Sequence, residues 1–355
     1  MQALVLAGGE GTRLRPLTST QPKPVVPLAG RPLISYLVDW LRRHGVDDVI
    51  LSCGFLAAGV RAVLGQGEGL GVRLRYVEEP EPLGTAGPLK LAQELLDERF
   101  LVLNGDVLTD LDLGAQLERH GRSGARATIA LVSVEDPSAY GLVRLGADGA
   151  VREFVEKPAP EEIDGDLINA GAYVLERDVL DLIPAGRAVS IEREVFPQLI
   201  GAGLYGHRCE GYWLDVGTPE RYLQATFDLL EGRVAGAQGV LGADGAGVVG
   251  PVLMGPGCVL EAGSLIGPLA VLGSGVEVGR GALIERSVVL DRARIGAHAR
   301  LRDCVVCADA SVGEGSELSE LAILGAGGRL GARRRLEAGA RIFPGMELPD
   351  GAMTS

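Results

Sequence analysis

The chain has 355 residues, a formal net charge of −13, 46% hydrophobic residues and 23% charged residues. This length fits about two domains with a sizeable core, and a negative charge without a basic stripe argues against a general nucleic-acid binder. The N-terminus lacks the features of a secretory signal, and no apolar run approaches the roughly 18 residues of a membrane span. We therefore expect a cytoplasmic globular protein that binds neither nucleic acid nor membranes.

The first two thirds of the chain alternate short apolar runs with amphipathic segments. The pattern predicts strands at residues 3–7, 49–52, 72–77, 100–103 and 128–134, and helices at residues 33–43, 86–96 and 113–120. Such alternation predicts an α/β layer fold with a mainly parallel sheet. In these sheets, ligands bind beyond the carboxyl ends of the strands.

The segment that follows the first predicted strand is rich in glycine and is followed by cations. Backbone N–H groups can approach phosphate oxygens closely at Gly8, Gly9 and Gly11. Arg13 and Lys23 supply positive charge. The spacing matches neither the dinucleotide fingerprint nor the P-loop. We interpret the segment as a polyphosphate-binding loop.

Two aspartates stand at the ends of predicted strands. Asp106 follows an apolar run, and Asp215 precedes a helix predicted to begin near Pro219. Two carboxylates suit Mg²⁺ that keeps several waters and takes its other ligands from substrate phosphates. Taken singly, each aspartate fits a turn or a helix cap at least as well.

Five cysteines are present, an odd number without the spacing of a disulfide framework. Cys304 and Cys307 have the two-residue gap of a metal motif, but no second pair or histidine cluster accompanies them. We therefore expect no metal or redox chemistry at this pair.

After a Gly/Ala-rich join near residues 232–247, the hydrophobic period changes to six. Aliphatic residues recur at Met254, Leu260, Ile266, Leu272, Val278, Ile284 and Leu290, step irregularly through Ile295, Leu301 and Val306, and resume from Val312 to Leu348. Each face of a triangular coil can then bury one side chain against the next coil. The pattern resembles a left-handed parallel β-helix. We place the domains at residues 1–232 and 248–355, joined by the Gly/Ala-rich linker.

The string from Gly8 to Thr18, followed by Pro22-Lys23-Pro24, resembles the signature of the sugar-1-phosphate nucleotidylyltransferases. The resemblance implies a Rossmann-like α/β domain with a mixed, mainly parallel sheet. In that family the N-G-D and D-V-G-T-P motifs carry the metal-binding aspartates, so it also implies Mg²⁺ on Asp106 and Asp215. The strings at residues 82–89 and 190–197 look like those of mannose-1-phosphate guanylyltransferases with a C-terminal β-helix.

The resemblance also implies roles for individual residues. The implied catalytic residues are Arg13, Lys23, Asp106 and Asp215, and the implied nucleotide-binding residues are Leu6, Ala7, Gly8, Gly9, Gly11, Thr12, Arg13, Glu79, Gly84 and Thr85. Sugar hydroxyls and the sugar phosphate are implied to contact Tyr140, Gly141, Glu156, Lys157 and Asn169.

Glu79 aligns with the residue that reads the base in the thymidylyltransferases of this family. A carboxylate only accepts hydrogen bonds, and the Watson–Crick edge of guanine offers adjacent N1–H and N2–H donors. Glu79 therefore favours GTP over a pyrimidine nucleotide. The alternative is that Glu79 is a solvated acid of a charged loop.

The expected reaction is attack of mannose 1-phosphate on the α-phosphate of GTP, which gives GDP-mannose and pyrophosphate. Three alternatives remain: a glucose-1-phosphate uridylyl- or thymidylyltransferase, a non-catalytic regulatory subunit that binds a nucleotide sugar, and a bifunctional protein whose β-helix transfers acyl groups. The last needs a base, and the only histidine of the tail, His298, fits an exposed turn better. We expect the repeats to support a homo-oligomer.

Overall fold

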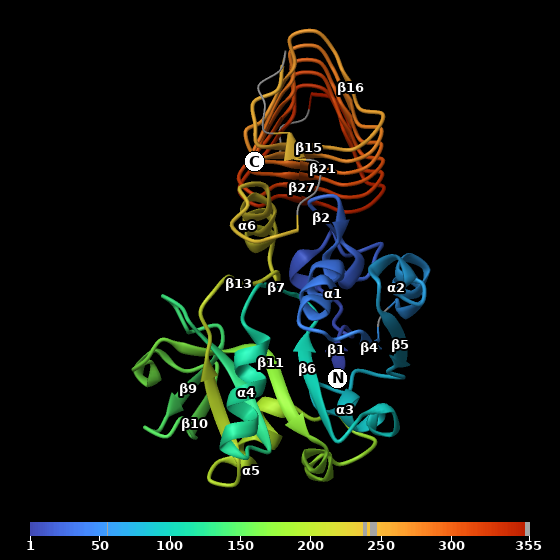
Figure 1. Cartoon of the computed structure of the whole chain (residues 1–355). Helices are drawn as coiled ribbons and strands as arrows, with labels where there is room; N and C mark the ends of the chain where they lie inside the picture. Colours follow the sequence, from blue (N-terminus) through green and yellow to red (C-terminus); the bar gives the residue numbers. More distant parts are fainter. Residues whose placement is uncertain (55, 237–239, 242–246, 352–355) are drawn as a thin grey trace. The chain divides into compact units, whose positions relative to one another are not determined.

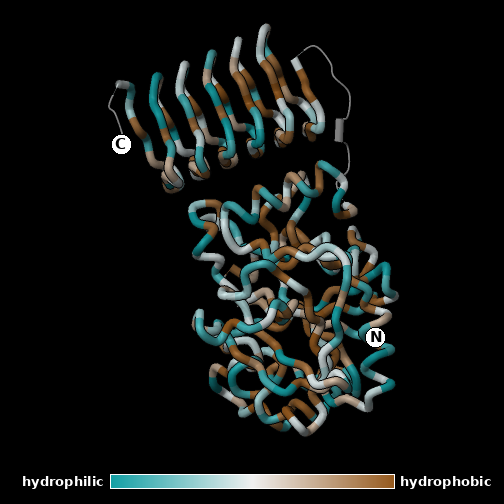
Figure 2. The backbone as a smooth tube through the Cα atoms, turned by 90° about the vertical axis from the view of Figure 1, so that its left-hand side faces the viewer, coloured by the Kyte–Doolittle hydropathy of each residue, from teal (hydrophilic) through white to brown (hydrophobic). Residues whose placement is uncertain are grey.

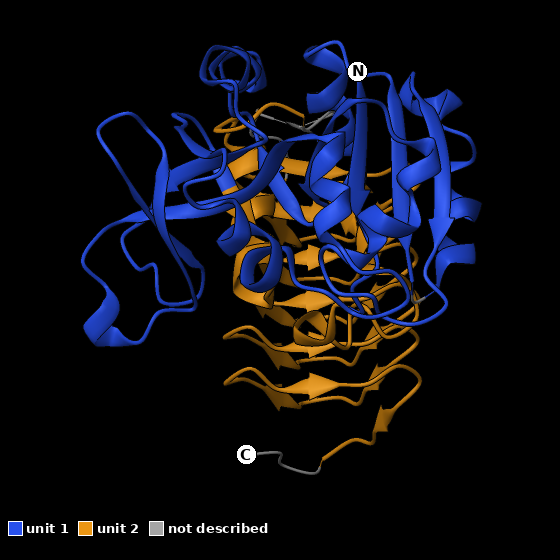
Figure 3. Ribbon diagram, turned by 90° about the horizontal axis from the view of Figure 1, so that it is seen from below, with its two compact units in different colours: residues 1–10, 34–213 blue, residues 11–33, 214–355 orange. Residues whose placement is uncertain are grey.

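The computed structural model describes residues 1–54, 56–236, 240–241 and 247–351. The chain forms two compact units (Figure 3), one of residues 1–10 and 34–213 and one of residues 11–33 and 214–355. These units are defined by which residues pack together. The predicted domain boundaries rest instead on the change to a six-residue hydrophobic period, and they stay a prediction. Much of the predicted linker, residues 237–239 and 242–246, lies outside the described residues.

The first unit is built on a mixed nine-stranded sheet (Figure 1). Its parallel part contains, in order, β6 (Arg99–Asn104), β1 (Gln2–Leu6), β4 (Asp48–Cys53) and β5 (Arg73–Glu78). Antiparallel pairs add β11 (Leu167–Glu176), β9 (Gly141–Leu145), β10 (Val151–Glu156) and β8 (Ala127–Ser133), while β12 (Leu204–Arg208) runs parallel to β8. The expectation of a Rossmann-like α/β domain with a mixed sheet is confirmed.

The central strands place several predicted site segments at one edge of the sheet. Leu4, Ile50 and Val102 lie fully buried in β1, β4 and β6, as expected for parallel strands with both faces covered. In register, Leu6 lies opposite Ser52 and Asn104 at the carboxyl ends of these strands. The segments after β1, β5 and β6 therefore begin at a common edge.

The helices are α1 (Leu33–Arg43), α2 (Ala57–Leu64), α3 (Gly87–Leu91), α4 (Leu113–Ser123), α5 (Phe196–Leu199) and α6 (Pro219–Leu230). Helix α4 is capped at its start by Asp112 Oδ1, which accepts the Ala115 N–H at 3.0 Å, and at its end by Gly124, which has a left-handed φ of 59°. No helix among the described residues is long and apolar enough to span a membrane.

The prediction of one helix over residues 86–96 is wrong. Helix α3 ends at Leu91, and a 3₁₀ turn follows over Gln93–Leu95. Leu89, Ala92 and Leu96 all enter the core. Their spacing of three and then four residues is also that of an α-helical face, so the burial pattern does not reveal the break. The backbone does, because the Leu95 N–H donates to Ala92 O at 2.8 Å and the Leu96 N–H to Gln93 O at 3.3 Å, which is the three-residue pattern of a 3₁₀ turn.

The solenoid of the second unit has three parallel ladders of short strands. The first face carries β15 (Val252–Met254), β18 (Ala270–Leu272), β21 (Val288–Val289), β24 (Val305–Val306), β27 (Ile323–Leu324) and β30 (Arg341–Ile342), with β14 (Val240–Leu241) antiparallel at its end. The second carries β16 (Val259–Leu260), β19 (Glu277–Val278), β22 (Arg294–Ile295), β25 (Ser311–Val312), β28 (Arg329–Leu330) and β31 (Glu347–Leu348). The third carries β17 (Leu265–Ile266), β20 (Leu283–Glu285), β23 (Arg300–Arg302), β26 (Glu317–Leu318) and β29 (Arg335–Leu336). These stacked ladders are those of a left-handed β-helix.

The predicted inward positions of the solenoid hold with one correction. In register, Leu272 lies beside Val289 and Val289 beside Val306, so the inward residue of β21 is Val289 and not Leu290. Residues 288–290 are all aliphatic, so the period alone could not choose between them. Successive coils show hydrophobic segments at matching positions (Figure 2). His298 lies exposed in a turn with φ of 58°, as expected.

The outward positions, one residue before each inward one, differ between the faces of the solenoid. On the first face they are aliphatic in five successive coils, and none is more than 7% exposed: Leu253, Val271, Val288, Val305 and Ile323. On the other two faces most are charged, among them Glu277, Arg294, Arg300 and Arg335. A β-carbon on Gly30, between β2 (Pro27–Leu28) and β3 (Arg31–Pro32), would lie 3.3 Å from Leu253. The first face is therefore a packed surface within the second unit.

Candidate active site

The glycine turn after β1 is in contact with Glu79 in the first unit. Leu6 ends the strand, and the Ala7 N–H donates to Ser52 O at 2.8 Å. A β-carbon on Gly8 would lie 2.5 Å from Glu79 Oε1, so a larger residue would displace that carboxylate. A β-carbon on Gly9 would meet no atom within 4 Å. The turn therefore combines a close approach at Gly8 with open space at Gly9.

Glu79 is half-buried and held by two donors. Its Oε1 accepts from Ser52 Oγ at 2.9 Å, and its Oε2 accepts from the Leu83 N–H at 3.2 Å. A carboxylate has roughly four acceptor positions, so further donors can still bind. Glu79 is thus fixed at the edge of the sheet and is not a freely solvated loop acid.

The rest of the signature loop belongs to the second unit, where its backbone forms a tight turn. Gly11 has a left-handed φ of 62°, and its carbonyl accepts from the Leu14 N–H at 3.0 Å and from Thr18 Oγ1 at 2.8 Å. Thr12 begins a 3₁₀ turn that buries Leu14 and leaves Arg13 exposed. The positive φ and the close side chains of Thr18 and Lys23 both favour glycine at position 11.

Lys23 lies against this turn. A β-carbon on Gly11 would lie 3.2 Å from Lys23 Cβ, and Lys23 is only 8% exposed. Lys23 is the first residue of the 3₁₀ turn Lys23–Val25, and it follows Pro22, which has an extended conformation. The P-K-P motif therefore places the lysine stem beneath the glycine of the signature loop.

The second unit also brings Arg13 and Asp215 to one point. Strand β13 (Trp213–Asp215) leads into α6, whose N-cap Thr218 accepts the Arg221 N–H at 3.4 Å through its Oγ1. A β-carbon on Gly217 would lie 2.8 Å from Arg13 Nη2 and 3.0 Å from Asp215 Oδ2. Because Gly217 has no side chain, the Arg13 guanidinium and the Asp215 carboxylate can both approach its backbone.

Tyr140, Gly141, Glu156 and Lys157 meet at the pairing of β9 with β10. Gly141 lies opposite Glu156 in register, and a β-carbon on Gly141 would lie 2.9 Å from Glu156 Oε2. The Lys157 N–H donates to Tyr140 O at 3.0 Å, and Lys157 has a left-handed φ of 55°. The structure therefore brings these two sequence motifs together in the first unit.

Asn169 is held by its neighbours in β11. Its Nδ2 donates to the Tyr173 hydroxyl at 2.8 Å, and its Oδ1 accepts the Gly171 N–H at 2.9 Å. Burial raises the pKa of Tyr173, so that hydroxyl stays protonated. The amide of Asn169 has a fixed orientation as a result.

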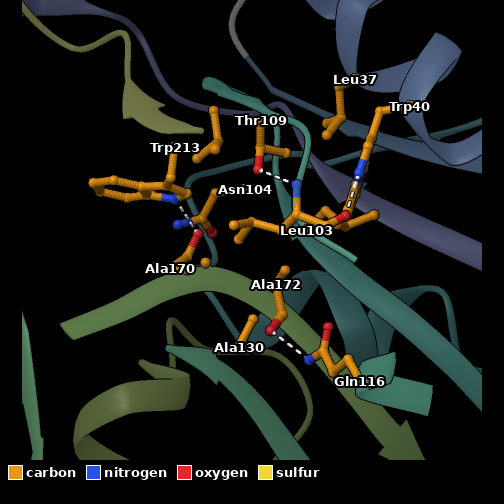
Figure 4. Close-up of a pocket in the computed structure, with 13 residues that line it drawn as sticks. Leu37, Trp40, Leu103, Asn104, Thr109, Gln116, Ala130, Ala170, Ala172 and Trp213 are labelled. Atoms are coloured by element: carbon orange, nitrogen blue, oxygen red, sulfur yellow. Dashed lines mark hydrogen bonds between the residues drawn. The ribbon is translucent and has the colours of Figure 1, made fainter. Parts of the chain in front are cut away.

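The sequence reasoning missed Trp213, although only Leu214 separates it from the D-V-G-T-P motif that begins at Asp215. Its Nε1 donates to Ala170 O at 2.8 Å, and its ring meets Tyr140 edge-on with centroids 5.4 Å apart. Figure 4 shows Trp213 beside Asn104 at a cavity of about 10 Å³, which is room for the centre of about one water. Trp213 therefore joins the 140–141 and 169–171 motifs.

Glu192 is a second residue that the motif reading missed, because its string served there only as a subfamily marker. It lies in a π-helical turn, Ile191–Val195, a conformation often found at functional sites. Its Oε2 accepts from Thr85 Oγ1 at 2.6 Å and from Ser190 Oγ at 2.8 Å. Gly84, with φ of 74°, approaches the Val189 carbonyl. The 84–85 motif is therefore anchored to the Glu192 turn.

Glu156 and Glu192 influence each other electrostatically. Burial and the nearby negative charge of Glu192 raise the pKa of Glu156, while Lys157 and Arg193 act in the opposite direction. A half-buried carboxylate beside a second one favours a partner that offers hydrogen-bond donors, such as sugar hydroxyls.

Asp106 stands in the turn between β6 and β7 (Val107–Thr109) and is half-buried. Within the described part of the chain, no group of three or more His, Cys, Asp or Glu residues could hold a metal ion. Two carboxylates nevertheless fit Mg²⁺, a hard ion that is usually held by one or two carboxylates and by substrate phosphates. Asp106 belongs to the first unit and Asp215 to the second, so a shared ion stays a proposal.

Comparison with known families agrees with these motifs. A model described as nucleotidyl transferase matches residues 2–232, and a model described as the GMPPB C-terminal domain matches residues 248–348. The chain belongs to the nucleotidyl transferase family. The first match spans the sheet and the signature loop, and the second spans the solenoid.

Several relatives cover most of the chain. A mannose-1-phosphate guanylyltransferase of Mycobacterium tuberculosis is 41% identical over 78% of this chain and 78% of its own length. Mannose-1-phosphate guanylyltransferase 1 of Arabidopsis thaliana is 38% identical over 92% of this chain and 91% of its own. A solved structure of a putative glucose-1-phosphate thymidylyltransferase from Bacillus anthracis, 27% identical, superposes with a TM-score of 0.59 over 64% of this chain and 94% of its own.

Proposed function

We propose that this nucleotidyltransferase moves the guanylyl group of GTP to mannose 1-phosphate and releases pyrophosphate. The observation that carries the proposal is the similarity to proteins named mannose-1-phosphate guanylyltransferase, which extends at 38% identity over 92% of the chain. The match to the thymidylyltransferase structure covers 64% of the chain. The relationship that covers most of both chains is the stronger argument for the guanylyltransferase activity.

The chemistry needs no general base. Mannose 1-phosphate is an anion at neutral pH, so its phosphate oxygen can attack the α-phosphorus in line, and pyrophosphate leaves. Catalysis then depends on positioning and on neutralising negative charge. The exposed Arg13 stabilises charge on the transferring phosphate and on pyrophosphate, Lys23 holds the α-phosphate or the pyrophosphate region, and Lys157 anchors the sugar phosphate. The approach of Arg13 to Asp215 at Gly217 supports the role of Arg13.

Asp106 and Asp215 are the residues that would hold Mg²⁺. When bound there, the ion would neutralise charge on the phosphates of both substrates. The family match and the donor chemistry of two carboxylates support this assignment. Removal of divalent ions with a chelator should abolish turnover, and added Mg²⁺ should restore it.

Glu79 is proposed to read the base. Its fixed position beside Gly8 supports the assignment, because the backbone of Gly8 to Thr12 is proposed to bind the nucleotide phosphates. The remaining acceptor capacity of the Glu79 carboxylate matches the two donors of guanine. On the sugar side, Glu156 accepts hydrogen bonds from hydroxyls and Asn169 both donates and accepts them, with Tyr140 and Gly141 shaping the site.

Pyrophosphate release with Mg²⁺ tests the proposal over a grid of GTP, dTTP, UTP and ATP against mannose 1-phosphate and glucose 1-phosphate. We expect the highest turnover with GTP and mannose 1-phosphate. A preference for a pyrimidine nucleotide with glucose 1-phosphate would contradict the Glu79 assignment but spare the mechanism. No turnover with any pair would favour a regulatory subunit.

We also propose that the chain forms a homo-oligomer in the cytoplasm. Large hydrophobic side chains lie exposed on early coils of the solenoid, with Val259 at 56%, Leu265 at 41% and Leu283 at 37%. Burial of such residues stabilises an assembly. Light scattering should give a mass above that of one chain, and a monomeric mass would contradict the assembly. Fractionation of the source cells would test the location.

A further inference from the structure

The row of outward side chains on the first face of the solenoid changes from aliphatic to charged in its last coil. Five coils present buried aliphatic residues at this position, as described above. In the sixth coil, the residue in register with Ile323 is Arg341. Arg341 therefore continues a row of apolar side chains that packs within the second unit. The groups that Arg341 contacts indicate its role.

Arg341 reaches the signature loop. Its Nη1 donates to the carbonyl of Arg13 at 3.0 Å and to the carbonyl of Arg15 at 2.9 Å. Hydrogen bonds from an ionised donor are stronger than neutral ones, and the two acceptors flank the end of the 3₁₀ turn that carries Arg13. One guanidinium nitrogen therefore holds two backbone carbonyls of this loop.

We propose that Arg341 is a positioning residue for the transfer reaction, which holds the signature loop in the shape that presents Arg13 to the phosphates. The inference rests on the proposed role of Arg13. It gives the solenoid a part in the active site that is separate from assembly. With Arg341 removed, the Arg13 and Arg15 carbonyls lose their shared donor, and a small displacement of a charge-stabilising group costs much of its effect.

The chain supplies matched controls. Arg329, Arg335 and Arg341 follow each other at intervals of six residues and occupy the outward position of the second, third and first face. All three are exposed. Arg335 pairs with Glu317 at 2.9 Å on the solenoid itself. Removing Arg329 or Arg335 therefore removes the same side chain without touching the signature loop.

The first experiment compares Arg341→Ala with Arg329→Ala and Arg335→Ala in pyrophosphate release. We expect Arg341→Ala to lower kcat/KM for GTP about tenfold, with KM for mannose 1-phosphate unchanged. Both controls should match the wild type, Arg341→Lys should recover part of the loss, and all melting temperatures should stay within about 2 °C. Arg341→Ala activity equal to that of the controls would overturn the proposal, as would a loss that only mirrors a lower melting temperature.

A second measurement does not depend on turnover. Trypsin cleaves after arginine, and the carbonyl of Arg13 is one of the two groups that Arg341 holds. We expect cleavage between Arg13 and Leu14 to be about tenfold faster in Arg341→Ala than in Arg335→Ala, because the loop opens more often. Equal cleavage rates would overturn the inference even in a protein without transferase activity. A wild type that is inactive but shows this difference would contradict only the proposed function.

Discussion

The two units hold their proposed site residues in different ways. In the first unit, Glu156, Glu192 and Asn169 are partly buried and are linked to neighbours by hydrogen bonds or electrostatic coupling. In the second unit, Arg13 is exposed, and its loop is held through the backbone carbonyls of Gly11, Arg13 and Arg15. Substitutions of these partly buried residues in the first unit should therefore change charge and pKa, whereas substitutions that release the loop of the second unit should change where the charge of Arg13 is presented.

The largest expected effect is that of removing the exposed cation. Arg13→Ala should lower kcat at least about a hundredfold, or on the order of 3 kcal/mol, because one preorganised charge-stabilising group is lost. Steady-state pyrophosphate release measures this. Arg43→Ala, at the exposed end of α1, is the control. A kcat within threefold of the wild type would remove Arg13 from the mechanism.

On the sugar side, the loss of a cation should affect binding instead. Lys157→Ala should raise KM for mannose 1-phosphate about tenfold, equivalent to roughly 1.4 kcal/mol, and change kcat less. Saturation curves for both substrates separate the two parameters. If KM for GTP rose and that for the sugar phosphate did not, Lys157 would belong to the nucleotide side.

Glu79 tests whether a fixed carboxylate of the first unit selects the base. Glu79→Gln replaces one acceptor oxygen by a donor, which should lower kcat/KM for GTP relative to dTTP by about tenfold. Competition between the two nucleotides gives the ratio directly. Glu81→Gln, on the same loop and exposed, is the matched control. An unchanged ratio would exclude Glu79 as the base reader.

The effect of Glu192 on Glu156 can be tested through the pH dependence of sugar-phosphate binding. The pKa of Glu156 is raised, so this carboxylate takes up a proton at a higher pH than an ordinary glutamate as the solution is acidified. KM for mannose 1-phosphate should therefore rise as the pH falls toward this raised pKa. Glu192→Gln removes the repelling charge and should move that rise to lower pH. Glu194→Gln, which breaks the ion pair with Arg187, should leave it in place.

The smallest effect concerns stability of the first unit. Burial lowers the pKa of His120, although the hydrogen bond to Glu176 opposes this shift. The unfolded chain therefore takes up a proton below pH 6.5 that the folded chain does not, and stability present above that pH is lost as the pH falls. The melting temperature should decrease between pH 7 and pH 5, and less steeply in His120→Gln. The exposed His298→Gln should keep the wild-type slope.

Features with a local period were predicted well. Helix α1 has the predicted ends, and the inward solenoid positions follow the six-residue pattern except at Val289. Among the predicted site residues, the structure brings Gly8 against Glu79, Arg13 and Asp215 to Gly217, and Gly141 against Glu156. Each of these was suggested by a motif, but no motif states which side chains touch.

The sequence by itself determined the fold class, the family and the solenoid, because repeated burial of one face and short backbone motifs are local properties. Tertiary structure alone decided the break after Leu91, the choice of Val289, and the contacts of Trp213 and Glu192. It also decided the hydrogen bonds from Arg341 to Arg13, residues 328 positions apart. Such contacts depend on how distant segments pack together, and no local period records that arrangement.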